Sequence, residues 1–412
     1  MKGQSNGAGC SVDGTNILHL ALGCIPDDAE ILRKLKRLPP KPSADINQTL
    51  IGRNYELGRI RSIRAPSADM LTVARTIDLM LHEGYMERNP FNPTVWRSFF
   101  SEISSPLAAE PGPAAFVIGA SGLGKTKCIQ RVLEGYTQVY VHPEFPNCTG
   151  GLTQLCWLYI QMPPSGNLKS LLAALIDATA FAFKDPEVLQ LLTISNRDLH
   201  GSLQNWVRFV QTHFLGLLVI DEVQNLFKLP SIEQRRSKRG RKELDLRLSD
   251  DVTLKTLMEI IEESGVPLML VGTPDASAIL QKRFAVSQRL TTGGQIEFRH
   301  AENFESPDFN MLLKTLEMYQ WSDVRLAIDD ELKKFIHSVT AGIRRLVISL
   351  WIAAHRVAIA SGSRNLTMKH FEMAAAGSLA PTRPAVDALL SGHPDAVRRF
   401  EDLFYDSDWR PE

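Results

Sequence analysis

The chain has 412 residues with 46 basic and 46 acidic side chains, so its formal net charge at pH 7 is zero and any contact with nucleic acid must be local. That length is enough for two or three folding units, whereas no apolar run approaches the roughly 20 residues of a membrane span. The first residues lack the apolar region of a signal peptide, and five scattered cysteines argue against disulfides or a zinc site. We therefore expect a cytoplasmic protein.

The region ahead of the first strong motif predicts helices and turns. Residues 1–60 are rich in turn-forming residues and predict a partly ordered segment that binds a partner. Residues 61–110 predict a helical linker, because apolar side chains over 68–83 recur as on one face of a helix. The pair Asn89-Pro90 ends that helix, and a second one is expected over 94–103.

A phosphate-binding loop pattern, G-x-x-x-x-G-K-T, follows a short apolar strand at 114–118. Its backbone N–H groups and the next helix attract anions. We expect Lys125 to reach the β- and γ-phosphates of ATP and Thr126 to bind Mg²⁺. The predicted nucleotide-binding residues are Gly119, Ala120, Ser121, Gly122, Leu123, Gly124, Lys125 and Thr126.

A second motif turns this phosphate site into a candidate hydrolase. An apolar strand at 217–220 ends in Asp221 and Glu222, at the sheet edge where open α/β folds bind ligands. Asp221 would hold Mg²⁺, directly or through water, and Glu222 would act as general base on the attacking water. A further strand, predicted over 155–162 between the two motifs, indicates the additional-strand class of P-loop ATPases.

Residues 235–242 hold six cations and project into solvent, since such a run cannot pack in a core. An anion such as the phosphate backbone of double-stranded DNA would offset the repulsion between these cations. The cations would then contact phosphates and read little base sequence. A solvated loop is the alternative. Lys169, at the start of the helix after the 155–162 strand, is a weaker candidate for the same surface. The predicted DNA contacts are Arg235, Arg236, Lys238, Arg239, Arg241, Lys242 and Lys169.

Polar residues after the later strands complete the predicted catalytic set. Thr273 follows a buried strand at 267–271 and is the candidate to contact the γ-phosphate or the attacking water. Its hydroxyl could equally cap the next helix, and the two roles are not exclusive. Arg289, just before a strand at 295–298, is the preferred arginine finger toward a neighbouring subunit, and Arg283 is the fallback.

Helices dominate from residue 301, as in the lid of an AAA+ module. A G-x-x-R element opens a long helix over 344–360, and Arg345 fits a second nucleotide-sensing arginine better than Arg344. The fold class is therefore α/β, with an AAA+ central parallel sheet flanked by helices and followed by a C-terminal helical lid. We predict an ATPase core, a helical lid and a tail that binds a partner, over residues 111–300, 301–380 and 381–412.

The chain resembles the TnsC-type AAA+ regulators of Tn-seven-like DNA transposons, relatives of the TniB and MuB proteins. The resemblance covers most of the chain. Its selective elements are a Gly-Tyr-x-x-Arg-Asn-Pro motif over 84–90 and the pair Ile-Asp-Glu-Val-Gln and Val-Gly-Thr-Pro, over 220–224 and 271–274. The phosphate loop and the lid segment 342–360 also fit.

The resemblance implies an ATPase that assembles as a ring or helical filament on double-stranded DNA. Such a protein connects a target-selection protein to the transposase, and ATP with Mg²⁺ controls its assembly. Two alternatives stay open: a protein-remodelling or signalling ATPase whose basic run binds an acidic protein, and a scaffold that binds ATP but barely hydrolyses it.

Overall fold

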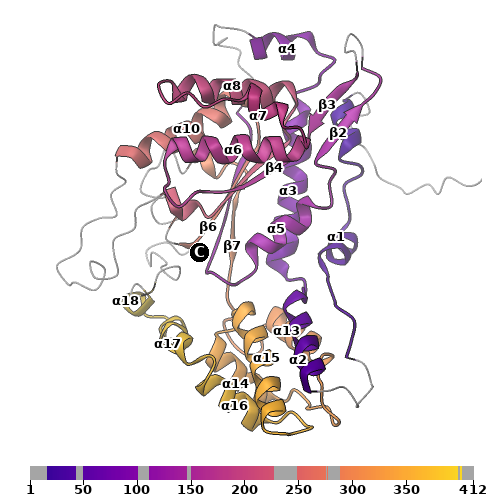
Figure 1. Cartoon of the computed structure of the whole chain (residues 1–412), viewed down its shortest axis with the longest axis vertical. Helices are drawn as coiled ribbons and strands as arrows, with labels where there is room; N and C mark the ends of the chain where they lie inside the picture. The colour runs from indigo at the N-terminus through magenta and orange to yellow at the C-terminus, as the bar shows by residue number, and fades with distance from the viewer. Residues whose placement is uncertain are drawn as a thin grey trace, which may run out of the picture.

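The computed structural model describes residues 16–42, 50–100, 111–145, 150–226, 248–274, 276, 288–397 and 400. In these residues the helices and strands form an α/β body and, below it in Figure 1, an all-helical body. Two of the predictions fall elsewhere: Arg283 and the basic run 235–242 lie outside the described residues.

A five-stranded parallel sheet, in the order β4-β5-β6-β1-β7, forms the centre of the α/β body among the described residues. Its strands are β1 (Ala114–Gly119), β4 (Trp157–Gln161), β5 (Leu217–Asp221), β6 (Leu268–Gly272) and β7 (Gln295–Phe298). The predicted parallel sheet is confirmed, and β6 lies between β1 and β5. The loop after β1 and the acidic pair at the end of β5 therefore lie at the same edge, one strand apart.

The strand predicted over 155–162 is present as β4, but it begins two residues later than predicted. The structure has two strands there, β3 (Leu152–Leu155) and β4, and β3 pairs antiparallel with β2 (Val139–His142) in a separate sheet. The change of partner occurs at Cys156, whose N–H donates to the Gln138 carbonyl while its own carbonyl accepts from the Leu217 N–H. The apolar run in the sequence gives no sign of this change from one sheet to the other, because the residues on both sides of the change are apolar.

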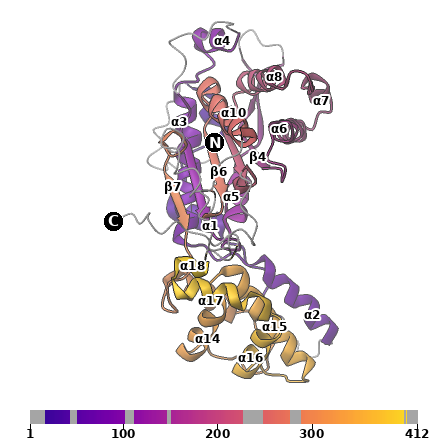
Figure 2. The same ribbon diagram turned by 90° about the vertical axis from the view of Figure 1, so that its left-hand side faces the viewer.

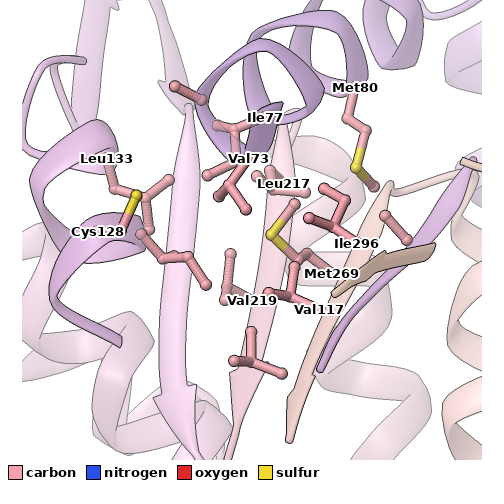
Figure 3. Close-up of a cluster of buried hydrophobic side chains, with 14 of the residues drawn as sticks. Val73, Ile77, Met80, Val117, Cys128, Leu133, Leu217, Val219, Met269 and Ile296 are labelled. Carbon is pink, nitrogen blue, oxygen red and sulfur yellow. The ribbon is translucent and has the colours of Figure 1, made fainter. Parts of the chain in front are cut away.

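Helices cover both faces of the sheet (Figure 2). On one face lie α3 (Ala68–Met86) and α5 (Lys125–Leu133), and on the other lie α6 (Leu168–Phe183), α8 (Leu199–Thr212) and α10 (Leu248–Ser264). Alternate strand residues supply the two cores. Figure 3 shows the first core, in which Val117, Val219 and Met269 from three strands gather beneath Val73 and Ile77 of α3.

The helical body follows the sheet in the chain and confirms the predicted lid. Its elements are α13 (Pro307–Glu317), α14 (Asp330–Thr340), α15 (Arg344–Ala360), α16 (Met368–Ala376), η4 (Ala380–Thr382), α17 (Arg383–Ser391) and α18 (Pro394–Val397). Two elements from before the sheet, α2 (Leu50–Gly58) and η2 (Arg59–Ser62), also belong to it, because Leu57 and Ile60 share its core with Trp351.

The remaining elements are η1 (Ile17–Ala21), α1 (Asp28–Leu35), α4 (Pro93–Phe100), α7 (Glu187–Leu191) and η3 (Val223–Leu226). Among the described helices none has, by itself, the length and apolar character of a membrane span, although the bent pair of α14 and α15 meets that criterion jointly.

Candidate functional site

The predicted phosphate loop connects the end of β1 to the first residue of α5. Gly119, Gly122 and Gly124 have φ angles of 155°, 91° and 107°, which side chains with a Cβ rarely adopt. The Lys125 ammonium lies over the loop and donates to the carbonyls of Gly119 and Ala120, the latter at 3.0 Å. The loop thus brings a cation and the amino end of a helix together. Both attract negative charge, so the arrangement suits an anion such as a phosphate.

Asp221 lies at the end of β5, only 2 % exposed, in direct contact with the phosphate loop. Its Oδ2 accepts from the Thr126 hydroxyl at 2.6 Å, and its Oδ1 accepts from the Glu222 N–H at 2.7 Å. The two predicted metal ligands therefore adjoin each other. Hydroxyl and carboxylate oxygens are the donors that Mg²⁺ prefers, so these residues fit the ion.

Tyr159 is a site residue that the sequence analysis missed. Its hydroxyl donates to the same Asp221 Oδ2 at 2.8 Å, from the neighbouring strand β4. Burial, followed by the negative charge of Asp221, raises the pKa of the Tyr159 phenol, so it keeps its proton near neutrality. Only the pairing of β4 with β5 brings the two side chains together, and the apolar run around Tyr159 carries no polar signal of it.

Glu222 has a strained backbone and a tethered carboxylate. Its φ is 58°, in the left-handed region that non-glycine residues usually avoid and that recurs at functional sites. Its Oε2 accepts a hydrogen bond from the Gln224 side-chain amide. The side-chain oxygen of Gln224, Oε1, in turn accepts from the Thr273 N–H at 3.3 Å. The acidic residue after β5 is thereby linked to the residue after β6.

Thr273 is 4 % exposed, and its hydroxyl has no hydrogen-bond partner among the residues that the structure describes. A buried hydroxyl without a partner costs about 1–3 kcal/mol, and such groups call for an explanation in function. No capping hydrogen bond from this hydroxyl is seen in the described part of the next helix. The hydroxyl is therefore available to a ligand at the sheet edge.

Arg345 and Arg344 both lie against the phosphate loop. Arg345 lies on the phosphate loop: its N–H donates to the Gly122 carbonyl at 3.1 Å, and a Cβ added at Gly122 would lie 3.1 Å from the Arg345 Cβ. The Arg344 Cδ would lie 3.8 Å from a Cβ added at Gly124. Its guanidinium donates to the Ala65 carbonyl, and burial lowers its pKa. Both arginines therefore adjoin the loop, and Arg344 has in addition a partner in the chain segment before α3.

Arg289 lies far from the phosphate loop of its own chain. It is more than half exposed and forms an ion pair with Glu262 of α10. Four residues later, the Gly293 N–H donates to the carbonyl of Ala114, the first residue of β1. The loop lies at the other end of this six-residue strand, which spans roughly 20 Å at about 3.3 Å per residue.

Lys169 is exposed in the first turn of α6. The turn before this helix contacts both elements that flank the segment with the basic run. The Gly166 carbonyl accepts from the Thr253 hydroxyl of α10 at 3.2 Å, and Asn225 of η3 donates to the Met162 carbonyl at 2.8 Å. Described residues on either side of 227–247 thus contact the turn just before the helix that carries Lys169.

The Gly-Tyr-x-x-Arg-Asn-Pro motif ties α3 to the chain just before β5. The Tyr85 hydroxyl donates to the Phe214 carbonyl at 2.9 Å, and the buried Arg88 guanidinium donates to the Leu215 carbonyl at 2.7 Å. Gly84 packs so closely on Pro267 that a Cβ would lie 2.4 Å from its ring. The motif therefore fixes the start of β5 and the residue before β6.

Comparisons with known proteins agree with this fold. Residues 110–280 match the family model described as an AAA domain. A search of the curated proteins finds no match.

Solved structures similar to this chain include the Aeropyrum pernix ORC1 protein in complex with DNA (16 % identity, 76 % of this chain and 67 % of that chain, TM-score 0.42). Drosophila ORC bound to DNA (13 %, 89 % and 74 %, TM-score 0.44) and the Thermotoga maritima RuvB Holliday junction branch migration motor (11 %, 72 % and 67 %, TM-score 0.33) are similar too. At such TM-scores nothing about activity or partners follows. The residues that match the AAA domain model include the phosphate loop and Asp221, which lie in direct contact.

Proposed function

We propose that this chain is an ATP-dependent DNA-binding regulator of DNA transposition. In this proposal it oligomerises as a ring or filament on double-stranded target DNA and links a target-selection protein to the transposase. The observation that carries the proposal is the position of the basic run in the chain, shortly after the acidic pair. The last described residue before the 235–242 run is Leu226 of η3, and η3 itself directly follows Glu222. The six cations therefore come soon after the acidic pair in the sequence.

The residues of the site have distinct tasks in ATP hydrolysis. Lys125 and the loop N–H groups bind the phosphates, and Thr126 and Asp221 hold Mg²⁺. When bound, Mg²⁺ neutralises charge on the β- and γ-phosphate oxygens. Glu222 accepts a proton from the attacking water. The Thr273 hydroxyl, buried without a partner among the described residues, donates to the γ-phosphate or to that water.

The proposal includes a nucleotide site shared between subunits, with Arg289 as the arginine finger. Because Arg289 lies four residues before Gly293, which bonds the amino end of β1, its guanidinium would reach a γ-phosphate in another subunit. It would leave Glu262 to do so, and surface ion pairs cost only about 0–1 kcal/mol to break. ATP then bridges neighbours, and its hydrolysis weakens the assembly.

The DNA surface is formed by the basic segment together with Lys169. Cations there contact phosphates, which supply affinity without base sequence information. Target-site choice must then come from the partner proteins. A Gly-Tyr-x-x-Arg-Asn-Pro motif in front of the AAA domain, as in the TnsC-type regulators, supports transposition as the process served.

ATP-dependent assembly on DNA tests the proposal. We expect the protein with a non-hydrolysable ATP analogue to sediment as large complexes on duplex DNA of any sequence. Lys125→Ala is expected to abolish these complexes, because it removes the cation that binds the β- and γ-phosphates. Lys127→Ala on the same helix, whose exposed side chain bonds Gln130, is the matched control. A wild-type protein that remains monomeric with ATP and DNA would overturn the proposal. ATP turnover that is indifferent to DNA would favour a protein remodeller.

Neutralising the basic run tests the DNA surface separately. Six phosphate contacts predict a slope of log K against log salt near −5, or about −0.9 per contact. We expect the sixfold glutamine variant to lose most of that slope and to keep its ATP affinity, measured by fluorescence anisotropy across a salt series. Neutralising Arg356 and Lys369, exposed on the lid, should change neither quantity. Normal DNA binding by the sixfold variant would mean that another surface binds DNA. The replaced residues are Arg235, Arg236, Lys238, Arg239, Arg241 and Lys242.

A further inference from the structure

We infer that Gln224 is a positioning residue that couples the end of β6 to the carboxylate of Glu222. No sequence pattern singled out this side chain for a role of its own. The inference rests on the proposed function of Glu222 as general base.

The side-chain amide of Gln224 forms hydrogen bonds through both its nitrogen and its oxygen, to residues that follow two different strands. Its nitrogen donates to Glu222 Oε2, and its oxygen accepts from the Thr273 N–H at 3.3 Å. An amide group is planar, so the two hydrogen bonds cannot change independently. A shift of the Thr273 backbone therefore reorients the Glu222 carboxylate.

Glu222 needs such a support, because little else in the described structure holds its side chain. Its backbone is in the left-handed region with φ of 58°, and the hydrogen bond of its N–H goes to Asp221 rather than to the sheet. No other hydrogen bond to the Glu222 carboxylate is seen in the described residues. The orientation of the carboxylate is thus set by its neighbour two residues later.

Anchoring η3 does not explain the arrangement. Asn225, the next residue, already attaches this element to the β4 end through its hydrogen bond to the Met162 carbonyl, at 2.8 Å. Gln224 faces the opposite neighbour, β6, where the partnerless Thr273 hydroxyl lies. A phosphate bound by that hydroxyl would act on the Thr273 backbone, and Gln224 conveys the change to Glu222.

The decisive variant is Gln224→Met, which keeps the length of the side chain and removes both hydrogen bonds. We expect kcat for ATP to fall about 10- to 100-fold, as for other groups that orient functional side chains, while KM and the affinity for a fluorescent ATP analogue stay within twofold. In the Glu222→Gln background the same change should lower kcat by less than a further twofold, because a residue that acts through Glu222 gives non-additive effects.

Asn225→Leu is the matched control, since it frees η3 from β4 without touching Glu222. It should leave kcat within about twofold of the wild type. An equal loss in both variants, or additive losses with Glu222→Gln, would reduce Gln224 to a structural role. A rise in kcat would also overturn the inference, because it would mean that Gln224 restrains Glu222. If Glu222→Gln alone leaves turnover intact, the proposed function of Glu222 fails instead.

Discussion

Replacing Glu222 by glutamine is expected to lower steady-state ATP turnover about 10²- to 10⁴-fold, the usual contribution of a positioned general base. Glutamine keeps the size of the side chain and an oxygen that can accept the hydrogen bond from Gln224, but it cannot take the proton of the attacking water. ATP affinity should not change, because the proposed phosphate contacts of Lys125 and the loop stay as they are. Turnover is measured by phosphate release, and affinity by titration of a fluorescent ATP analogue.

The same variant should also prolong assembly. If hydrolysis weakens the subunit contacts, complexes of Glu222→Gln on duplex DNA will outlast those of the wild type after excess competitor DNA is added. Glu83→Gln, at an exposed position of α3, is the control. Turnover within twofold of the wild type would exclude Glu222 as the base. A tightly bound but equally dynamic complex would instead point to the scaffold alternative, in which hydrolysis has no role.

Truncating Arg88 to alanine is expected to destabilise the α/β body by about 3 kcal/mol. The guanidinium is buried, with one cation–π contact to Tyr85 at 5.1 Å and hydrogen bonds to the Gly84 and Leu215 carbonyls. Hydrogen bonds that involve a charged group contribute about 1.5–3 kcal/mol each, and truncation also leaves a cavity. Burial lowers the pKa of Arg88 to about 10, so the group stays charged at neutral pH.

The measurement is the urea midpoint of unfolding, followed by tryptophan fluorescence. Arg97→Ala, at an exposed position of α4, should shift stability by less than about 0.5 kcal/mol. A loss below 1 kcal/mol for Arg88→Ala would show that Tyr85 and Gly84 suffice to attach α3. ATP turnover at low temperature, where the variant stays folded, should remain near the wild-type value, because Arg88 does not contact the site.

Local signals in the sequence were strong enough to predict the sheet and the centre of the site. Gly119–Thr126 and Asp221-Glu222 each combine a short pattern with an apolar strand, and the physics of both is local. Glycines permit the loop conformation, and buried parallel strands end in polar residues at one edge. The long helix over 344–360 has the predicted bounds, since its apolar face and its glycine start lie in one segment.

Other parts of the site depend on pairings between distant segments. Tyr159 reaches Asp221 only because β4 pairs with β5. The strand expected over 155–162 starts later than predicted, because Leu155 pairs with β2 and the pairing with β5 begins only at Trp157. Likewise α2 joins the lid through Leu57 and Ile60, although nearly 250 residues separate it from α13.

The sequence by itself determined that a phosphate loop and an acidic pair follow buried parallel strands of an AAA-type sheet. Both signals consist of residues that are adjacent in the chain. Only the tertiary structure decided which side chains hold that pair. Tyr159 and Gln224 reach it through strand order and through the left-handed turn at Glu222. Hydrogen bonds between such side chains depend on contacts far apart in the chain, and no period or spacing in the sequence encodes them.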